Sequence, residues 1–160
     1  MGFQDRCLEK RAAGIEIYES LCYSSQYYGE GRVRVFKTKW FARYARRAGI
    51  RDESLCEAIA RAERGLVDAD LGGGVIKQRI ARTGQGRSGG YRTLIAYRMK
   101  DRSVFLYGFA KNERENISDD ELTTLREIAA GWFNADEERL GRAVEMGVLQ
   151  EVHYEEEQQT

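Results

Sequence analysis

Residues 75–81, Val75-Ile76-Lys77-Gln78-Arg79-Ile80-Ala81, decide the fold, because side-chain character alternates along them as it does in a β-strand. Successive side chains of a strand point to opposite faces of a sheet. Lys77, Arg79 and Ala81 therefore share one face, and Ile76, Gln78 and Ile80 share the other. A strand that carries two cations on one face predicts a basic sheet surface.

Two further strands are expected directly after this one. Residues 91–98 place Arg92, Leu94, Ala96 and Arg98 on one face, and residues 103–110 are rich in the aromatic residues that strands favour. Asp101-Arg102 marks the turn between them. The connection from Arg82 to Gly90 is rich in glycine and basic residues. These segments predict three adjacent strands joined by short connections.

Helical patterns flank the three strands. A short strand over 33–36 precedes a helix that Thr38 caps and Gly49 ends, and a second helix opens at Asp52. After the strands, Ser118-Asp119-Asp120-Glu121 has the form of a capping box, and a second box starts at Asn134, with a stop at Gly147. The predicted class is α+β. It has a small antiparallel sheet, an N-terminal helical hairpin and C-terminal helices, with the helices packed on one sheet face.

Three segments are expected along the chain. Residues 1–32 are poorly patterned and predict a poorly ordered extension, so the natural protein is hypothesised to start near Val33; a full-length intact mass of the native protein would refute that. Residues 33–147 form the domain, and residues 148–160 form an acidic tail.

Composition excludes several classes of protein. No run of 18 apolar residues and no apolar N-terminal segment occurs in the 160 residues, so a cytoplasmic protein without a membrane partner is expected. The three cysteines are scattered, which argues against a disulfide framework or a thiolate zinc site. The single His153 excludes a histidine triad. No metal or other cofactor is expected, and catalysis must use Lys, Arg, Tyr, Ser or carboxylates.

The net charge of zero conceals an uneven distribution. Residues 33–118 contain 19 Lys and Arg against 9 Asp and Glu, a net charge of +10. Residues 119–160 contain 3 against 12, a net charge of −9. A basic body predicts a polyanionic partner. The alternative is that the two regions neutralise each other within the fold.

The basic residues gather on the three strands and their connections, which favours RNA as the polyanion. Lys and Arg displace counterions from phosphates, and Arg binds a phosphate through two N–H groups. Glycines in the 82–90 loop permit close approach of the backbone to phosphates. The alternative is an ordinary solvated surface. Tyr91, at the start of a strand, is the best placed aromatic for stacking on a base, whereas Trp40, Phe41, Trp132 and Phe133 are expected in the core. The cluster comprises Lys77, Arg79, Arg82, Arg87, Arg92, Arg98 and Lys111.

Such a cluster suits RNA cleavage without a metal. The 2′-hydroxyl must lose its proton and attack phosphorus, the phosphorane charge must be stabilised, and the departing 5′-oxygen must gain a proton. Arg79, Arg92 and Lys111 are expected to stabilise charge. Lys77 is the candidate base, because surrounding positive charge lowers the pKa of an ammonium group.

Three motifs resemble the RelE/ParE superfamily, and its HigB-like branch in particular: residues 75–82, Gly89-Gly90-Tyr91-Arg92, and the segment from Tyr107 to Glu113. The resemblance covers about residues 33–147 and implies a small fold like that of microbial RNases. It implies a type II toxin that cleaves mRNA, commonly on the ribosome, and that a helix-turn-helix antitoxin inhibits. The family's basic strand positions fall on Lys77 and Arg79, its transition-state arginine on Arg92, and its last basic residue on Lys111. Arg82, Arg87, Tyr91, Arg98 and Asn112 are assigned to RNA binding.

One departure from the family pattern leaves alternatives open. Members that use a tyrosine as acid or base place it a few residues after the last strand, and residues 112–118 contain none. The three hypotheses are an endoribonuclease toxin, a ParE-like inhibitor of DNA gyrase without nuclease activity, and an RNA-binding module without activity.

Overall fold

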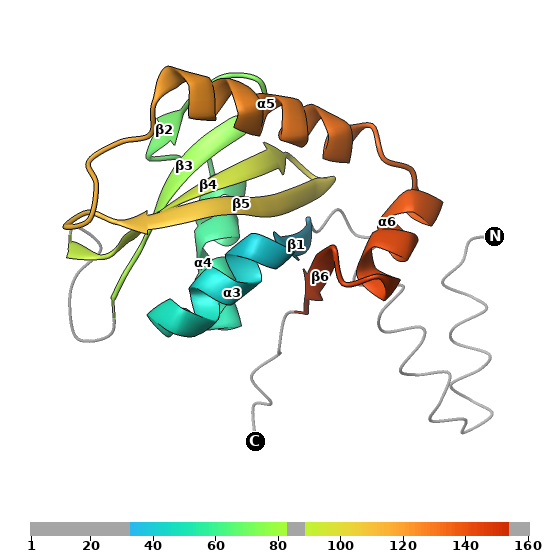
Figure 1. Cartoon of the computed structure of the whole chain (residues 1–160), viewed down its shortest axis with the longest axis horizontal. Helices are drawn as coiled ribbons and strands as arrows, with labels where there is room; N and C mark the ends of the chain where they lie inside the picture. Colours follow the sequence, from blue (N-terminus) through green and yellow to red (C-terminus); the bar gives the residue numbers. More distant parts are fainter. Residues whose placement is uncertain (1–32, 83–88, 154–160) are drawn as a thin grey trace. The chain divides into compact units, whose positions relative to one another are not determined.

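The computed structural model describes residues 33–82 and 89–153, which form a twisted sheet with helices on both faces (Figure 1). The sheet has six strands in the order β2-β3-β4-β5-β1-β6. The elements are β1 (Arg34–Thr38), α3 (Lys39–Ala48), α4 (Asp52–Glu63), β2 (Ala69–Asp70), β3 (Val75–Ile80), β4 (Tyr91–Arg98), β5 (Arg102–Ala110), α5 (Asp119–Phe133), α6 (Glu137–Glu145) and β6 (Leu149–Val152).

The predicted central strands are confirmed, since β3, β4 and β5 form an antiparallel meander. The expectation of a wholly antiparallel sheet is wrong, because β1 lies parallel to β5, with Val35 opposite Ser103. A parallel pair requires a long crossover connection, and the chain from α3 to β4 supplies it. The sheet is therefore mixed, within an α+β fold.

Two strands, β2 and β6, were not predicted from the sequence because they are short. β2 has two residues, and β6 has four, of which only Leu149 and Val152 are buried. β6 pairs antiparallel with β1, opposite Val35 at one end and Thr38 at the other. Residues 149–152, which were assigned to the acidic tail, thus complete one side of the sheet.

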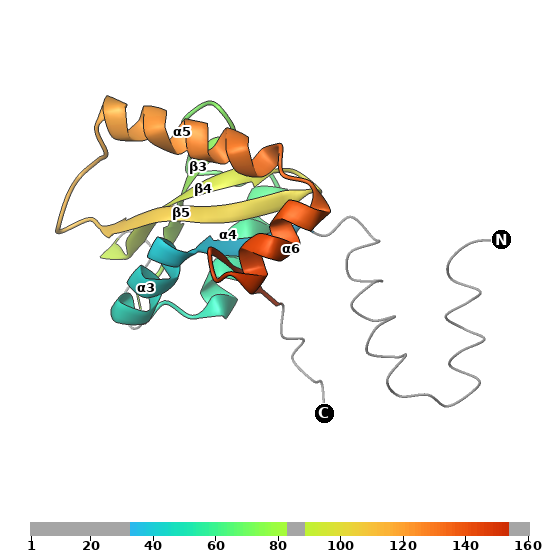
Figure 2. The same cartoon turned by 45° about the vertical axis from the view of Figure 1, so that its right-hand side comes forward.

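Helices cover both faces of the sheet, and the expectation that they pack on one face is wrong (Figures 1 and 2). One core lies between α3, α4 and the sheet and includes Phe41, Ile59 and Phe105. The other core lies under α5 and α6 and includes Phe36 and Leu140. The central strands have buried residues on both faces, so the sheet is held from two sides.

Local capping explains where the helices begin and end. Thr38 accepts a hydrogen bond from the N–H of Phe41, as predicted, and Gly49 ends α3 with a φ of 70°. The capping box between Ser118 and Glu121 is confirmed. Asp136, rather than Asn134, caps α6, because its carboxylate accepts from the N–H of Arg139. No helix in the described ranges is long and apolar enough to cross a membrane.

The position of β6 leads to a stability prediction. Leu149 is 1% exposed within the α5–α6 core, whereas its neighbour Val148 is 44% exposed. Leu149→Ala should lower the free energy of unfolding by about 2–5 kcal/mol, because it leaves a cavity in a packed core. Val148→Ala should change it by less than about 0.5 kcal/mol. Urea unfolding of the two variants measures both effects, and equal effects would show that β6 does not belong to the folded domain.

Candidate functional site

Three of the four predicted catalytic residues share the α5-side face of the sheet. Gln78 donates to the carbonyl of Ala58 on α4, so its strand neighbours Lys77 and Arg79 face the other way. On β4, Arg92 alternates with Leu94, which belongs to the α5-side core. Arg79 and Arg92 are directly opposite each other in the sheet register. Like charges directly opposite each other destabilise a sheet, so this pair lowers the stability of the fold.

Arg92 is the most unusual of these side chains. It is only 8% exposed, and one guanidinium nitrogen, Nη1, is buried without a hydrogen-bond partner among the described residues. A buried charged donor that lacks a partner carries a substantial desolvation cost. An anion placed on this face would supply the missing acceptor. Arg92 is therefore the candidate anion-binding group of this face.

Two residues outside the predicted set hold the backbone of Arg79. Its N–H donates to a carboxylate oxygen of Asp68 at 2.7 Å, and its carbonyl accepts from the guanidinium of Arg61. β2 pairs with β3 only as far as Lys77, so these side chains replace the missing strand at Arg79. The sequence signal for this supporting role was a charged residue, Arg61, among the buried residues of α4.

Lys77 contacts the segment that follows β5. Its Nζ lies 3.4 Å from the side-chain oxygen of Asn116. The same segment is anchored by Arg114, whose guanidinium binds both carboxylate oxygens of Glu121, at 3.0 and 2.7 Å. Arg114 lowers the pKa of Glu121 to about 2, so this carboxylate stays ionised and paired at neutral pH. Arg114 thus fixes the 112–118 segment against the start of α5.

Tyr107 brings a phenol to this face, although residues 112–118 contain no tyrosine. The register shift opposite Leu94 and Ile95 inserts Leu106 as an extra residue in β5. Strict alternation would turn Tyr107 to the side of Phe105, and this bulge turns it to the α5 side instead. Its hydroxyl accepts from Arg114 at 3.4 Å.

The register arranges the face as two neighbouring rows. Lys77 and Tyr107 are both opposite Leu94, and in the next row Arg79 and Phe109 are both opposite Arg92. Lys77 and Tyr107 therefore lie on the two strands that flank β4, one row from the buried guanidinium of Arg92. Such an arrangement can hold an anion and offers groups beside it that can exchange protons.

Aromatic residues border the site at the open part of β5. Trp40, at the start of α3, stacks on Tyr107 with ring centroids 4.6 Å apart, and also on Tyr44. Trp40 is 42% exposed, so its expected place in the core is wrong, whereas Phe41 is fully buried as predicted. Lys111, the fourth predicted catalytic residue, is exposed in the turn after β5.

The predicted RNA-binding residues do not all join this face. Tyr91 is 8% exposed and faces α3, where its hydroxyl donates to the carbonyl of Ala48, so it offers no free ring at the sheet rim. Arg82 and Asn112 line a hollow of about 410 Å³ on that side. Adjacent strand residues point to opposite faces, so Tyr91 and Arg92 are separated by the sheet itself.

Arg98 and the residues around the glycine-rich loop lie away from the Arg92 site or have a structural role. Arg98 lies six residues along β4 from Arg92, about 20 Å away, and stacks on Phe133 of α5. Arg87 lies outside the described residues. Gly90 is required by packing, because a Cβ there would lie 1.9 Å from the carbonyl oxygen of Ile80. Among the residues that the structure describes, no group of His, Cys, Asp or Glu side chains forms a metal site.

Comparison with known proteins identifies the family. The family model described as the RelE toxin of the RelE/RelB toxin–antitoxin system matches residues 33–152, which is three quarters of the chain and ends with β6. A search of individual curated proteins gives no match. The assignment to the HigB-like branch stays a prediction. The match spans every described element, and the chain therefore belongs to the RelE toxin family of toxin–antitoxin systems.

Proposed function

We propose that this toxin is a metal-independent endoribonuclease that cleaves mRNA on the ribosome, in the cytoplasm, until a helix-turn-helix antitoxin binds it. The observation that carries the proposal is the buried guanidinium of Arg92, which lacks an acceptor among the described residues and lies opposite Arg79. A scissile phosphate provides the acceptor. Family membership supports the toxin role and the antitoxin partner.

The cations suit the charge that develops during cleavage. The 2′-oxygen forms a bond to phosphorus while the bond to the 5′-oxygen breaks, which leaves a 2′,3′-cyclic phosphate and a 5′-hydroxyl. Negative charge builds up on the non-bridging oxygens in between. Arg92 and Arg79 stabilise this charge through N–H donors already in place, and Lys77 and Lys111 add positive potential at the rim.

Proton transfer needs one group that accepts the 2′-hydroxyl proton and one that protonates the 5′-oxygen. Lys77 and Tyr107 are the proposed pair, because they lie on the same face, one row from Arg92. Arg114 donates to the Tyr107 hydroxyl at 3.4 Å, which orients this phenol on the same face. Lys77 then serves as the second proton carrier. The exposed edge of Trp40 borders Tyr107 and provides an apolar surface for a neighbouring base.

Arg92→Ala tests the anion site. Cleavage of mRNA by purified toxin with ribosomes should fall about 10²- to 10³-fold, because the main donor to the phosphorane is lost. The free energy of unfolding should stay equal or rise, because the variant removes a buried charge that has no acceptor. Primer extension measures cleavage, and urea unfolding measures stability.

Arg98→Ala is the matched control, since Arg98 lies on the same strand and face but outside the site. It should cleave like the parent protein. Full activity of Arg92→Ala would overturn the nuclease proposal. If the parent protein leaves mRNA intact and stops supercoiling by gyrase, the ParE-like alternative is established. If it binds RNA and shows neither activity, it is the inactive binding module.

Tyr107→Phe tests the proton-transfer role. The substitution keeps the ring stack on Trp40 and removes only the hydroxyl, so cleavage should fall about 10²- to 10⁴-fold with little change in stability. The pH–rate profile should also change shape, because one of the two proposed proton carriers is lost. Tyr44→Phe is the control, because it removes a buried hydroxyl without a partner from the other side of the sheet. An unchanged rate and profile in Tyr107→Phe would rule out the phenol as a proton carrier.

A further inference from the structure

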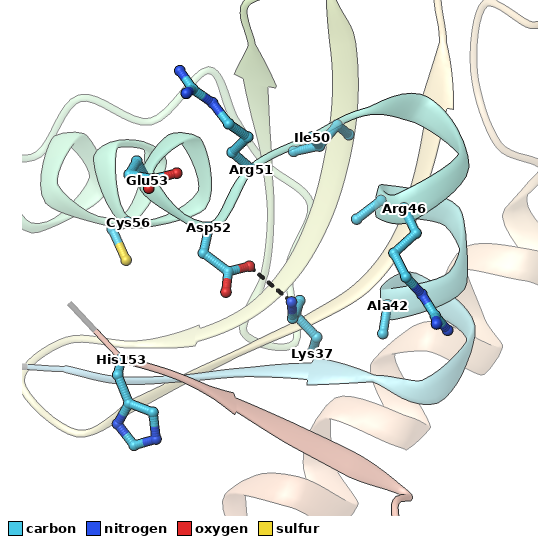
Figure 3. A pocket seen from close by; sticks show the side chains of 10 residues that line it. Lys37, Ala42, Arg46, Ile50, Arg51, Asp52, Glu53, Cys56 and His153 are labelled. Carbon is cyan, nitrogen blue, oxygen red and sulfur yellow. Dashed lines mark hydrogen bonds and ion pairs between the residues drawn. The ribbon is translucent and has the colours of Figure 1, made fainter. Parts of the chain in front are cut away.

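A second basic surface lies on α3, which packs against the opposite face of the sheet from Lys77 and Arg92. Several hollows border α3 there, and two of them are also lined by His153. One of about 540 Å³ lies toward α4, and one of about 500 Å³ lies toward α6 and β6. They share Ala42, Arg46 and His153. Figure 3 shows the first hollow, with Lys37 and Asp52 between α3 and His153.

The cations of α3 differ from those nearby because no described carboxylate pairs with them. Lys37 pairs with Asp52 at 2.8 Å, and Arg34 pairs with Glu151 at 3.0 Å. The exposed α3 cations form no ion pair with any residue in 33–82 or 89–153, and α3 has no acidic residue in its first turn. At spacings of four, three and one residues, most of them lie on one side of the helix. They are Lys39, Arg43, Arg46 and Arg47.

The hollow between α3 and β6 concentrates three of these cations. Lys39, Arg43 and Arg46 line it, and Glu151, the only carboxylate among the described residues that line it, is already bound to Arg34. Charge of one sign in a concave site raises the local potential for an opposite charge. The hollow therefore fits a short acidic peptide.

The residues that follow His153 in the sequence have the chemistry of such a peptide. His153, the last described residue, lines the hollow, and the sequence continues Tyr154-Glu155-Glu156-Glu157. The four residues from His153 to Glu157 span at most about 14 Å when extended. All three carboxylates are thus within reach of a hollow that begins at His153. A tethered ligand is also present at a high effective concentration.

We propose that Glu155–Glu157 bind in the hollow between α3 and β6, against Lys39, Arg43 and Arg46 of the same chain. The segment neutralises the α3 side and leaves the Lys77–Arg92 face as the open basic surface. It thereby competes with RNA for α3 and favours binding of RNA on the α5 side. The interaction is electrostatic, so salt weakens it.

Zero-length carbodiimide cross-linking tests the contact directly in the full chain. Carbodiimide joins carboxylates to lysine amines, and Lys39 is the exposed lysine of the hollow. Mass spectrometry should find Glu155–Glu157 joined to Lys39, at low micromolar protein, with loss of the product in 1 M salt. The Lys37–Asp52 pair is the internal positive control, and exposed Lys100, outside the hollow, is the negative control.

Mixing ¹⁵N-labelled and unlabelled chains identifies the donor of the carboxylate. Products within one isotopic species support the proposal. Products that join the two species show that the tail of a second copy fills the hollow, which would overturn it. Absence of the Lys39 product while the Lys37–Asp52 product forms would also overturn it.

A binding measurement tests the competition. The triple substitution Glu155→Gln, Glu156→Gln and Glu157→Gln should bind a fluorescent 12-nucleotide uridine oligomer several-fold more tightly at low salt. That gain should vanish in an Arg43→Gln, Arg46→Gln background and persist in an Arg142→Gln background, since Arg142 is exposed on α6 and pairs with Glu138. Unchanged affinity of the triple variant, or a gain that survives loss of Arg43 and Arg46, would refute the competition. None of these outcomes depends on nuclease activity.

Discussion

The β-ladder that keeps Arg79 opposite Arg92 is the constraint on which the functional face depends. Two guanidinium groups separate in water, and here the backbone hydrogen bonds of β3 and β4 hold them on adjacent strands. Both faces of the sheet carry a packed core, so the strands cannot part to relieve the repulsion. Asp68 and Arg61 prevent the outer strand from fraying at Arg79. The fold thus keeps two like charges on adjacent strands, where a bound anion would offset their repulsion.

Local pattern predicted the central sheet, while pairing between distant segments lay beyond it. The alternation in residues 75–81 and 91–98 placed Lys77, Arg79 and Arg92 on one face, because strand parity is a local property. The parallel contact of β1 with β5 and the addition of β6 join residues about 70 to 117 positions apart, as between Arg34 and Arg102 or Val35 and Val152. Short strands contain too few residues for their sequence pattern to predict such pairs.

Each site residue that was wrongly predicted or not predicted from the sequence has a physical explanation. Tyr91 adjoins Arg92, so parity alone excludes both from one face, and Arg98 shares the face but lies too far along the strand. Tyr107 required a structure, because the bulge at Leu106 reverses the parity that the sequence implies. Arg114 acts through Glu121, and that contact joins the end of β5 to the start of α5.

The net charge of zero is consistent with a polyanion-binding protein because neutralisation in this fold is selective. Acidic residues from the C-terminal region pair with Arg34 and Arg114, which support the sheet and the 112–118 segment. Lys77, Arg79 and Arg92 form no ion pair with any described residue. Carboxylates of the C-terminal region therefore neutralise part of the basic body at its margins, as one interpretation of the uneven charge expects. The middle of the sheet keeps positive charge that no described carboxylate pairs with, which leaves the prediction of a polyanionic partner open.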